Sequence, residues 1–190
     1  MNLTNRSFQI GAITLVIIVL AAAAYFFSRG ATSDAPQPMQ TYLNGEYGIT
    51  FDYPVGYQLS ERDLEGSAQR KRHMVTLIRE EDLPAPENGE GPPSISIMIV
   101  QNNLDGLTAK QWIENSADSN FKQSVDQGTA EVKVGGRDGL LYRWSGLYEG
   151  ETAAVATPKW IYAFSVTFQS EDDDIVADYR QILNSVAYSR

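Results

Sequence analysis

Runs in which apolar and polar side chains alternate recur along this chain, and they restrict its possible folds more than any other feature. In the stretch YGITFDY, we expect Tyr47, Ile49, Phe51 and Tyr53 on one face of a strand and Asp52 on the other. Further strands are predicted at residues 74–79, 94–101, 129–134, 140–144, 152–157 and 160–169. Successive strands with short connections pair antiparallel, because a parallel return needs a crossover of about a dozen residues.

Two segments have helical periodicity instead. The first begins at Thr108, and Gln111 completes the signature of a capping box. The second is predicted to be capped by Ser170, with Asp173 closing its box. The apolar stripes are Ala109, Trp112, Ile113, Ala117 and Phe121 in the first helix, and Ile175, Val176, Tyr179, Ile182, Leu183 and Val186 in the second. This order of elements predicts an α+β domain, with one antiparallel β-sheet flanked by helices.

A separate segment precedes this domain. The stretch FQIGAITLVIIVLAAAAYFF, from Phe8 to Phe27, carries no charge, and as a helix it spans roughly 30 Å, the thickness of the hydrocarbon core of a bilayer. We predict that residues 8–27 form a transmembrane helix and an uncleaved signal anchor, after a short segment of residues 1–7. Residues 28–44 have two prolines and no apolar periodicity, so we predict a flexible linker. Residues 45–190 then form one globular domain.

Alternatives to a signal anchor remain open. Ala22 and Ala24 match the small residues that precede a signal-peptide cleavage site, although the apolar region of a signal peptide is usually only about 7–15 residues long. A buried soluble helix is disfavoured because the segment has no polar face. A pilin-type stalk is disfavoured because Ser7 stands where pilins have glycine and Ala12 where they have glutamate.

The charges beside the apolar segment favour a domain outside the cytoplasm. Arg6 and the α-amino group precede the segment, whereas Arg29 follows it and is soon offset by Asp34. We therefore predict a single-pass protein of the cell membrane, with its short N-terminus inside and its C-terminal domain extracytoplasmic.

Charge and cysteine content exclude several classes of function. Arg6 and Arg29 are the only charged side chains before residue 30, so residues 30–190 hold 13 of the 15 bases and all 24 acids, a net charge of −11. Such a domain is repelled by phosphate backbones, and we predict no nucleic-acid partner. The absence of cysteine excludes disulfides, thiolate catalysis and cysteine-ligated zinc.

Five segments together resemble the PsbP-like fold family, which also includes Mog-type Ran-binding proteins and small bacterial lipoproteins. They are YGITFDYPVGY, TAKQWIEN, VKVGGRDGLLYRW, YAFSVTF and DYRQILNSVAY. Pro54 and Gly56 match the early turn of the family, with Tyr57 standing where tryptophan is commoner. Gly135-Gly136 matches the glycine after the mid-chain strand, and residues 179–188 match the closing helix and short terminal strand.

This resemblance covers about residues 45–190 and implies an antiparallel sheet between helices, an α/β/α sandwich. The chain would be a membrane-anchored bacterial member of the family. Family members bind different partners and share no catalytic constellation, so the resemblance implies an adaptor or assembly role beside a membrane complex.

Few side chains suit catalysis or metal binding. His73 is the only histidine and lies in a basic run that we interpret as a solvated turn. The acids at 171–174 are interpreted as the first turn of a helix rather than a cation site. Asp52 would need a second carboxylate such as Glu46 or Asp63 for glycoside hydrolysis, and no motif brings them together. We therefore predict no catalytic, cofactor-binding or metal-binding residue.

Trp160 follows the predicted Pro158-Lys159 turn and is our candidate for an exposed contact residue. The predicted function is non-catalytic, with a protein-binding, adaptor or assembly role. Its partners would be the membrane, through the N-terminal helix, and an unidentified protein. A small-ligand or cation-binding domain and a carboxylate-dependent hydrolase are the alternatives.

The predicted topology is tested by protease protection. If the domain is extracytoplasmic, protease added to intact cells in which the outer face of the membrane is accessible will digest residues 45–190. Protection of the domain until the membrane is dissolved would contradict this topology.

Overall fold

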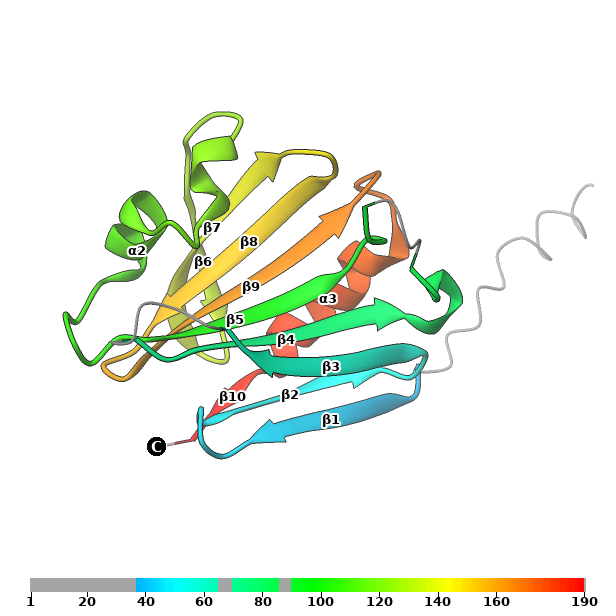
Figure 1. Ribbon diagram of the computed structural model, residues 1–190, viewed down its shortest axis with the longest axis horizontal. Coiled ribbons are helices and arrows are strands. Elements are labelled where there is room, and N and C mark those ends of the chain that lie inside the picture. The colour runs from blue at the N-terminus through cyan, green and yellow to red at the C-terminus, as the bar shows by residue number, and fades with distance from the viewer. Residues whose placement is uncertain (1–36, 65–69, 86–89, 190) are drawn as a thin grey trace, which may run out of the picture. The chain divides into compact units, whose positions relative to one another are not determined.

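The computed structural model describes residues 37–64, 70–85 and 90–189, which form one α+β domain (Figure 1). The predicted transmembrane segment, Phe8–Phe27, lies outside these residues, as does most of the predicted linker. Within the described ranges, no helix is both long enough and apolar enough to span a membrane.

The strands form two antiparallel sheets rather than the single sheet predicted. The larger sheet has the order β3(Tyr57–Asp63)-β4(Arg72–Arg79)-β5(Ile95–Gln101)-β9(Trp160–Phe168)-β8(Glu149–Ala156)-β7(Arg137–Ser145)-β6(Ala130–Val134). The smaller sheet has the order β1(Met39–Asn44)-β2(Ile49–Pro54)-β10(Ala187–Tyr188). The helices are α2(Ala109–Asn115) and α3(Asp174–Ser185), with 3₁₀ turns η1(Glu80–Asp82) and η2(Asn120–Gln123).

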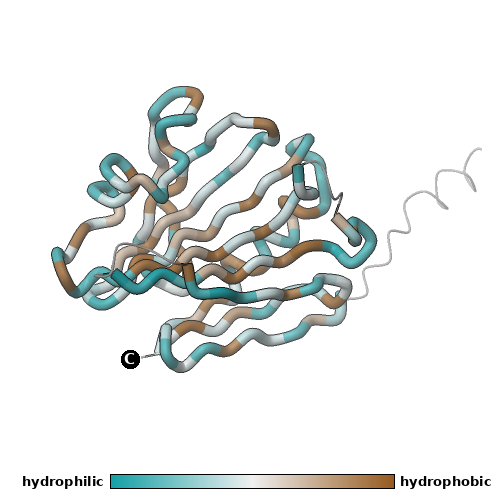
Figure 2. The backbone as a smooth tube through the Cα atoms, in the orientation of Figure 1, coloured by the Kyte–Doolittle hydropathy of each residue, from teal (hydrophilic) through white to brown (hydrophobic). Residues whose placement is uncertain are grey.

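The main core lies between the larger sheet, the smaller sheet and α3. Apolar and polar residues alternate along the strands (Figure 2), and one set of side chains points into this core. Phe51 of β2, Ile97 of β5, Phe164 of β9 and Tyr179 of α3 are each at most 1% exposed. The Tyr179 hydroxyl donates a hydrogen bond of 3.0 Å to the carbonyl of Phe164, which fixes α3 against the sheet.

A second apolar cluster covers part of the opposite face of the larger sheet. Trp112 and Ile113 of α2 pack there with Tyr142 of β7 and with Ile161 and Ala163 of β9. Residues 161 and 163 alternate with the core residues 162 and 164, so β9 is buried on both faces. Helices therefore lie on both sides of the larger sheet, as predicted.

Two strands occur where none was predicted. The predicted linker is too long, because Met39–Asn44 pair with β2 as strand β1. The sequence of β1 shows no alternation of apolar and polar residues, because the apolar residues Tyr42 and Leu43 are neighbours. In the structure Tyr42 points into the core, whereas Leu43 is 75% exposed. The other strand, β3, is mostly polar, and its side chains Glu61 and Asp63 accept hydrogen bonds from Tyr42 of β1 and from Tyr47 in the turn before β2.

The capping box of α2 is confirmed, because the Thr108 side chain accepts the Gln111 N–H and the Gln111 side chain accepts the Thr108 N–H. The helix is shorter than predicted, however, and Phe121 lies in η2. The cap predicted for α3 is wrong. The helix begins at Asp174, and the Asp173 carboxylate accepts the backbone N–H groups of Gln169 and Ser170.

The glycine turn is confirmed as a hairpin turn but is shorter than predicted. Gly135 and Gly136 alone form it, with φ of 57° and 76°, and β7 begins at Arg137. Two residues with positive φ suit the tight turns that match strand twist. A Cβ on Gly135 would lie 2.6 Å from the carbonyl oxygen of Val186, so this position is restricted by space as well.

Replacement of Phe51 tests the orientation of β2. The side chain is 1% exposed, so Phe51→Ala leaves a cavity, and we expect it to lower the free energy of unfolding by about 3–5 kcal/mol in urea melts. Leu43→Ala is the control, because that exposed side chain contributes about 0.5 kcal/mol or less. Equal stability of Phe51→Ala and the parent would show that the faces of β2 are reversed.

Candidate functional site

Trp160 is not an exposed contact residue. Only 5% of it is exposed, and its ring packs edge-on against Tyr47 at a centroid distance of 5.1 Å. The prediction is wrong because Trp160 begins β9 in register with the core residues Tyr162 and Phe164. The neighbouring Lys159 ammonium lies 5.2 Å from the ring centroid.

The three carboxylates considered for hydrolysis have three separate partners. Asp52 accepts a 2.6 Å hydrogen bond from the Thr41 hydroxyl, between β2 and β1. Glu46 forms an ion pair with Lys71 at 3.0 Å, and Asp63 contacts His73.

His73 is buried, which corrects its interpretation as part of a solvated turn. It is 6% exposed, and its ring stacks on Tyr47 with centroids 4.4 Å apart. Its Nδ1 lies 2.8 Å from an Asp63 carboxylate oxygen and its Nε2 lies 3.3 Å from one of Glu61. The Tyr47 hydroxyl donates to Asp63 at 3.1 Å, and the Tyr42 hydroxyl donates to Glu61 at 2.8 Å. We call these five residues the histidine cluster.

The histidine cluster joins the two sheets. Its tyrosines belong to β1 and to the turn before β2, whereas the histidine and the carboxylates belong to β4 and β3. Burial, followed by the hydrogen bond to Asp63, raises the pKa of Tyr47 to about 12, so this hydroxyl remains a donor at neutral pH. Asp63 lies at Nδ1 of His73 and Glu61 at Nε2, on opposite sides of the ring. A single metal ion therefore cannot be coordinated by both carboxylates and by a nitrogen of this ring. In the part of the chain described, no group of three or more such side chains is placed to hold a metal ion.

The acids at 171–174 do not converge either. Glu171 pairs with Arg143 of β7, and Asp173 receives the two backbone N–H groups that precede α3. Those backbone hydrogen bonds hold the pKa of Asp173 below its ordinary value.

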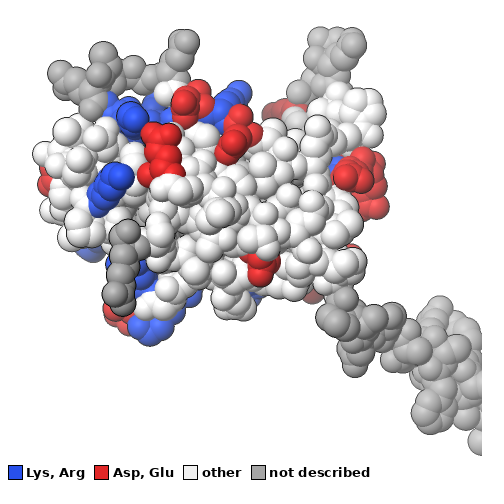
Figure 3. Space-filling model, turned by 90° about the horizontal axis from the view of Figure 1, so that it is seen from below, with Lys and Arg blue, Asp and Glu red and all other residues white. Residues whose placement is uncertain are grey.

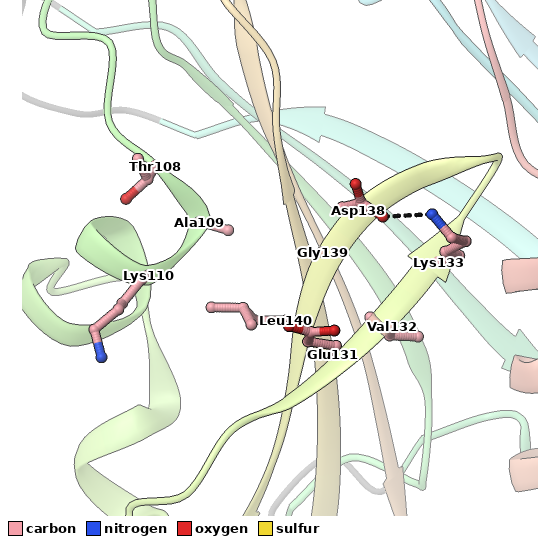
Figure 4. A pocket seen from close by; sticks show the side chains of 9 residues that line it. All are labelled: Thr108, Ala109, Lys110, Glu131, Val132, Lys133, Asp138, Gly139 and Leu140. Carbon is pink, nitrogen blue, oxygen red and sulfur yellow. Dashed lines mark hydrogen bonds and ion pairs between the residues drawn. The ribbon is translucent and has the colours of Figure 1, made fainter.

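A groove of about 630 Å³ separates the start of α2 from the β6–β7 hairpin (Figure 4). Ala109 of α2 and Leu140 of β7 point towards one another across it, whereas Val132 of β6 points to the other side of the sheet. Lys133 and Asp138 form an ion pair at its rim. The groove has an apolar centre and a charged border, and it is the candidate functional site.

A second cavity of about 410 Å³ shares Thr108, Ala109 and Asp138 with the groove and continues to Pro158. A third, of about 390 Å³, lies on the α3 side of β6 and is lined by Val132 and Arg180 among others. Strand β6 is therefore bordered by a cavity on each face of the sheet.

The third cavity contains a buried carboxylate. Glu151 of β8 has a side chain only 3% exposed, and both of its oxygens accept hydrogen bonds of 3.2 Å from Arg180 of α3. The Arg143 Nε lies 3.5 Å from one of these oxygens. The two arginines compensate the buried negative charge, which alone would be strongly destabilising.

Sequence reasoning did not find the groove residues. A signal for one pair was present, since a two-residue turn at Gly135-Gly136 places Lys133 directly opposite Asp138. No sequence signal brings Ala109 opposite Leu140, because their positions across the groove depend on how α2 packs on the sheet.

The lowered pKa of Asp63 predicts a pH-dependent contribution of the histidine cluster. Hydrogen bonds from His73 and then Tyr47 hold that pKa below its ordinary value. A carboxyl group of this kind stabilises the fold above its unfolded-state pKa, about 3.9, and loses this effect as the pH falls through its folded-state pKa. We expect Asp63→Asn to lower the free energy of unfolding near neutral pH and to match the parent in strong acid.

Urea melts at several pH values measure this difference, with Asp82→Asn as the control at an exposed acid of η1. A difference between Asp63→Asn and the parent that persists unchanged in acid would show that the ionised carboxylate is not what stabilises the cluster.

No family model matches this chain, and no curated protein matches its sequence. Solved structures do resemble its fold. The solution structure of the cyanobacterial PsbP protein CyanoP from Synechocystis sp. PCC 6803 superposes with a TM-score of 0.51 at 12% identity, over 84% of this chain and 97% of that one. A crystal structure from Bacteroides thetaiotaomicron has a TM-score of 0.41 at 9% identity, over 80% of this chain and 48% of that one. The CyanoP match, at this identity, concerns the fold alone, and residues 37–189 have a PsbP-like fold.

Proposed function

We propose that this chain is a single-pass membrane-anchored protein whose extracytoplasmic domain binds a partner protein without catalysis. In this role it would hold or assemble a complex close to the membrane. The observation that carries the proposal is the groove between α2 and the β6–β7 hairpin.

The chemistry of the groove suits a protein segment. Ala109 and Leu140 provide an apolar centre, and Lys110, Glu131, Lys133 and Asp138 surround it with both signs of charge. Protein interfaces commonly combine an apolar core with a polar rim. The cavity beside Pro158 extends the groove, so an elongated ligand has room along it.

The distribution of charge also supports a protein partner. On the face shown in Figure 3, which includes β1 and β2, the centre is largely uncharged and acids lie next to bases along one border. A nucleic-acid surface instead needs a continuous basic stripe, and the domain as a whole is acidic.

The anchoring part of the proposal rests on the apolar segment Phe8–Phe27 and the polar, proline-containing residues that follow it. Such a linker would let the domain stand clear of the lipid and reach a neighbouring membrane protein. The likeness to PsbP-like proteins, whose members bind different partners, supports an adaptor or assembly role.

Crosslinked capture from native membranes tests the proposal. The full-length chain with an affinity tag is crosslinked, solubilised in detergent and purified, and the proteins recovered are compared between variants. Ala109→Arg fills the groove and should remove the partner. Ala117→Arg is the matched control, because residue 117 is exposed and lies outside the groove, and it should recover the same partner as the parent.

Recovery of the same proteins with Ala109→Arg as with the parent would contradict binding in the groove. Recovery of no specific protein with the parent, under several crosslinkers, would contradict the adaptor role itself.

A further inference from the structure

Strand β6 is the edge of the larger sheet that borders the groove. It pairs with β7 across the two-residue turn, which Val134 and Arg137 flank. In such a hairpin the flanking pair is hydrogen-bonded, and bonded and non-bonded pairs then alternate. Val132 is therefore bonded to β7, whereas Glu131 and Lys133 direct their backbone N–H and C=O groups away from the sheet.

These outward groups have no partner within the described residues. Strand β6 pairs only with β7, and no other backbone hydrogen bond in that part of the chain involves residues 130–134. Ala130, Glu131 and Lys133 are also exposed. An uncovered edge with free N–H and C=O groups is a template for one more strand.

The cavities on the two faces of β6 determine which side chains an added strand would need. Successive side chains of an added strand point to opposite faces of the sheet. Those on one face would enter the groove beside α2, and those on the other would enter the cavity beside α3. Val132 and Lys133 line both cavities, so both are within reach of a strand added at this edge.

We propose that β6 binds an extended segment of the partner protein by strand addition. In that segment, aliphatic residues facing the α2 groove alternate with acidic residues facing the α3 cavity. This inference rests on the proposed function and specifies the chemistry of the partner.

The residues of each cavity account for this alternation. The α2 groove offers the apolar side chains of Ala109 and Leu140. The α3 cavity is lined by the side chains of two arginines, Arg143 and Arg180, and by the carboxylate of the buried Glu151, whereas the Lys133 ammonium is paired with Asp138 at the rim of the α2 groove.

Both arginine side chains remain half-exposed, at 50% and 53%, but Arg143 already contacts two carboxylates, Glu151 and Glu171, whereas Arg180 contacts Glu151. A guanidinium group has five N–H donors, so Arg180 in particular can bind a further carboxylate. Backbone hydrogen bonds to β6 would supply affinity, and the two cavities would supply specificity, as in other strand-addition complexes.

Synthetic nine-residue peptides test the proposal with the full chain in detergent micelles. In the first peptide valine alternates with glutamate, and in the second and third valine alternates with glutamine or lysine. A fourth has the composition of the first but places the valines and glutamates in separate blocks. We expect the first peptide to bind at least about tenfold more tightly than the lysine and block peptides, as measured by fluorescence anisotropy.

A matched pair of variants tests the backbone contact. Lys133→Pro removes the outward N–H of β6 without removing a bond to β7, a position that edge strands tolerate. Lys133→Gln keeps that N–H and removes only the charge. We expect the proline variant to weaken binding of the first peptide by about tenfold or more and the glutamine variant by clearly less. Circular dichroism and urea melts verify that both variants remain folded.

Hydrogen–deuterium exchange then locates the contact. The first peptide should slow exchange in residues 129–136 and leave the β1 edge, residues 39–44, unchanged. Equal affinity for all four peptides, equal effects of the proline and glutamine variants, or protection at β1 instead of β6 would each overturn strand addition at β6. Concentration-dependent dimerisation that Lys133→Pro abolishes, with no binding of the first peptide, would assign the edge to a second copy of this chain and overturn it as well.

The two proposals fail separately. If Ala109→Arg removes the captured partner but Lys133→Pro does not, the groove binds a protein and strand addition is wrong. If neither variant changes capture while the first peptide still protects β6, the proposed partner role of the groove is wrong and the edge retains its affinity for an extended acidic segment.

Discussion

The antiparallel pairing of β5 with β9 is the contact on which the rest of the domain depends. It joins β3–β5, from the first half of the domain, to the β6–β9 meander, with Ile97 opposite Phe164 and Ile99 opposite Tyr162. The paired residues on one face belong to the main core, whereas Val100 and Ile161 belong to the second cluster. A shift of one residue would exchange the faces, so burial on both sides specifies this register.

The register of β5 and β9 determines which face of the larger sheet each of the other elements packs against. One face of the larger sheet receives α3 and the smaller sheet, and the other receives α2. His73 follows Val75 and Leu77 onto the first face, beneath the smaller sheet, although its neighbours in the sequence are basic. Burial then requires a partner for each polar atom of its ring, and Asp63 and Glu61 provide them. The histidine cluster is thus a consequence of packing, and its contacts join the two sheets.

The β6 edge of the larger sheet is where the proposed strand addition would take place. The chain segment between β5 and β6 includes α2, and its return places the helix beside the β6–β7 hairpin, where it forms one wall of the groove. Strand β6 lies outermost and has only β7 as a neighbour. The central strands use their backbone groups within the sheet, so the proposal places the partner at the unpaired groups of β6 and the cavities beside it.

Short-range patterns determined much of this protein without its structure. Strands β2, β4, β5 and β9, the capping box at Thr108 and the hairpin turn at Gly135-Gly136 depend on residues a few positions apart, and each occurs at or within a few residues of its predicted position. Strand β1 and the α3 cap were not obtained although their partners are close in sequence, because neither has a distinctive local pattern. The burial of His73 and Trp160 and the position of Ala109 facing Leu140 have another reason: their partners lie far away in the chain, and only the register of the sheets and the packing of the helices bring them together. A side chain's own sequence neighbours therefore predict its local conformation, whereas its burial and its role depend on which distant face is folded against it.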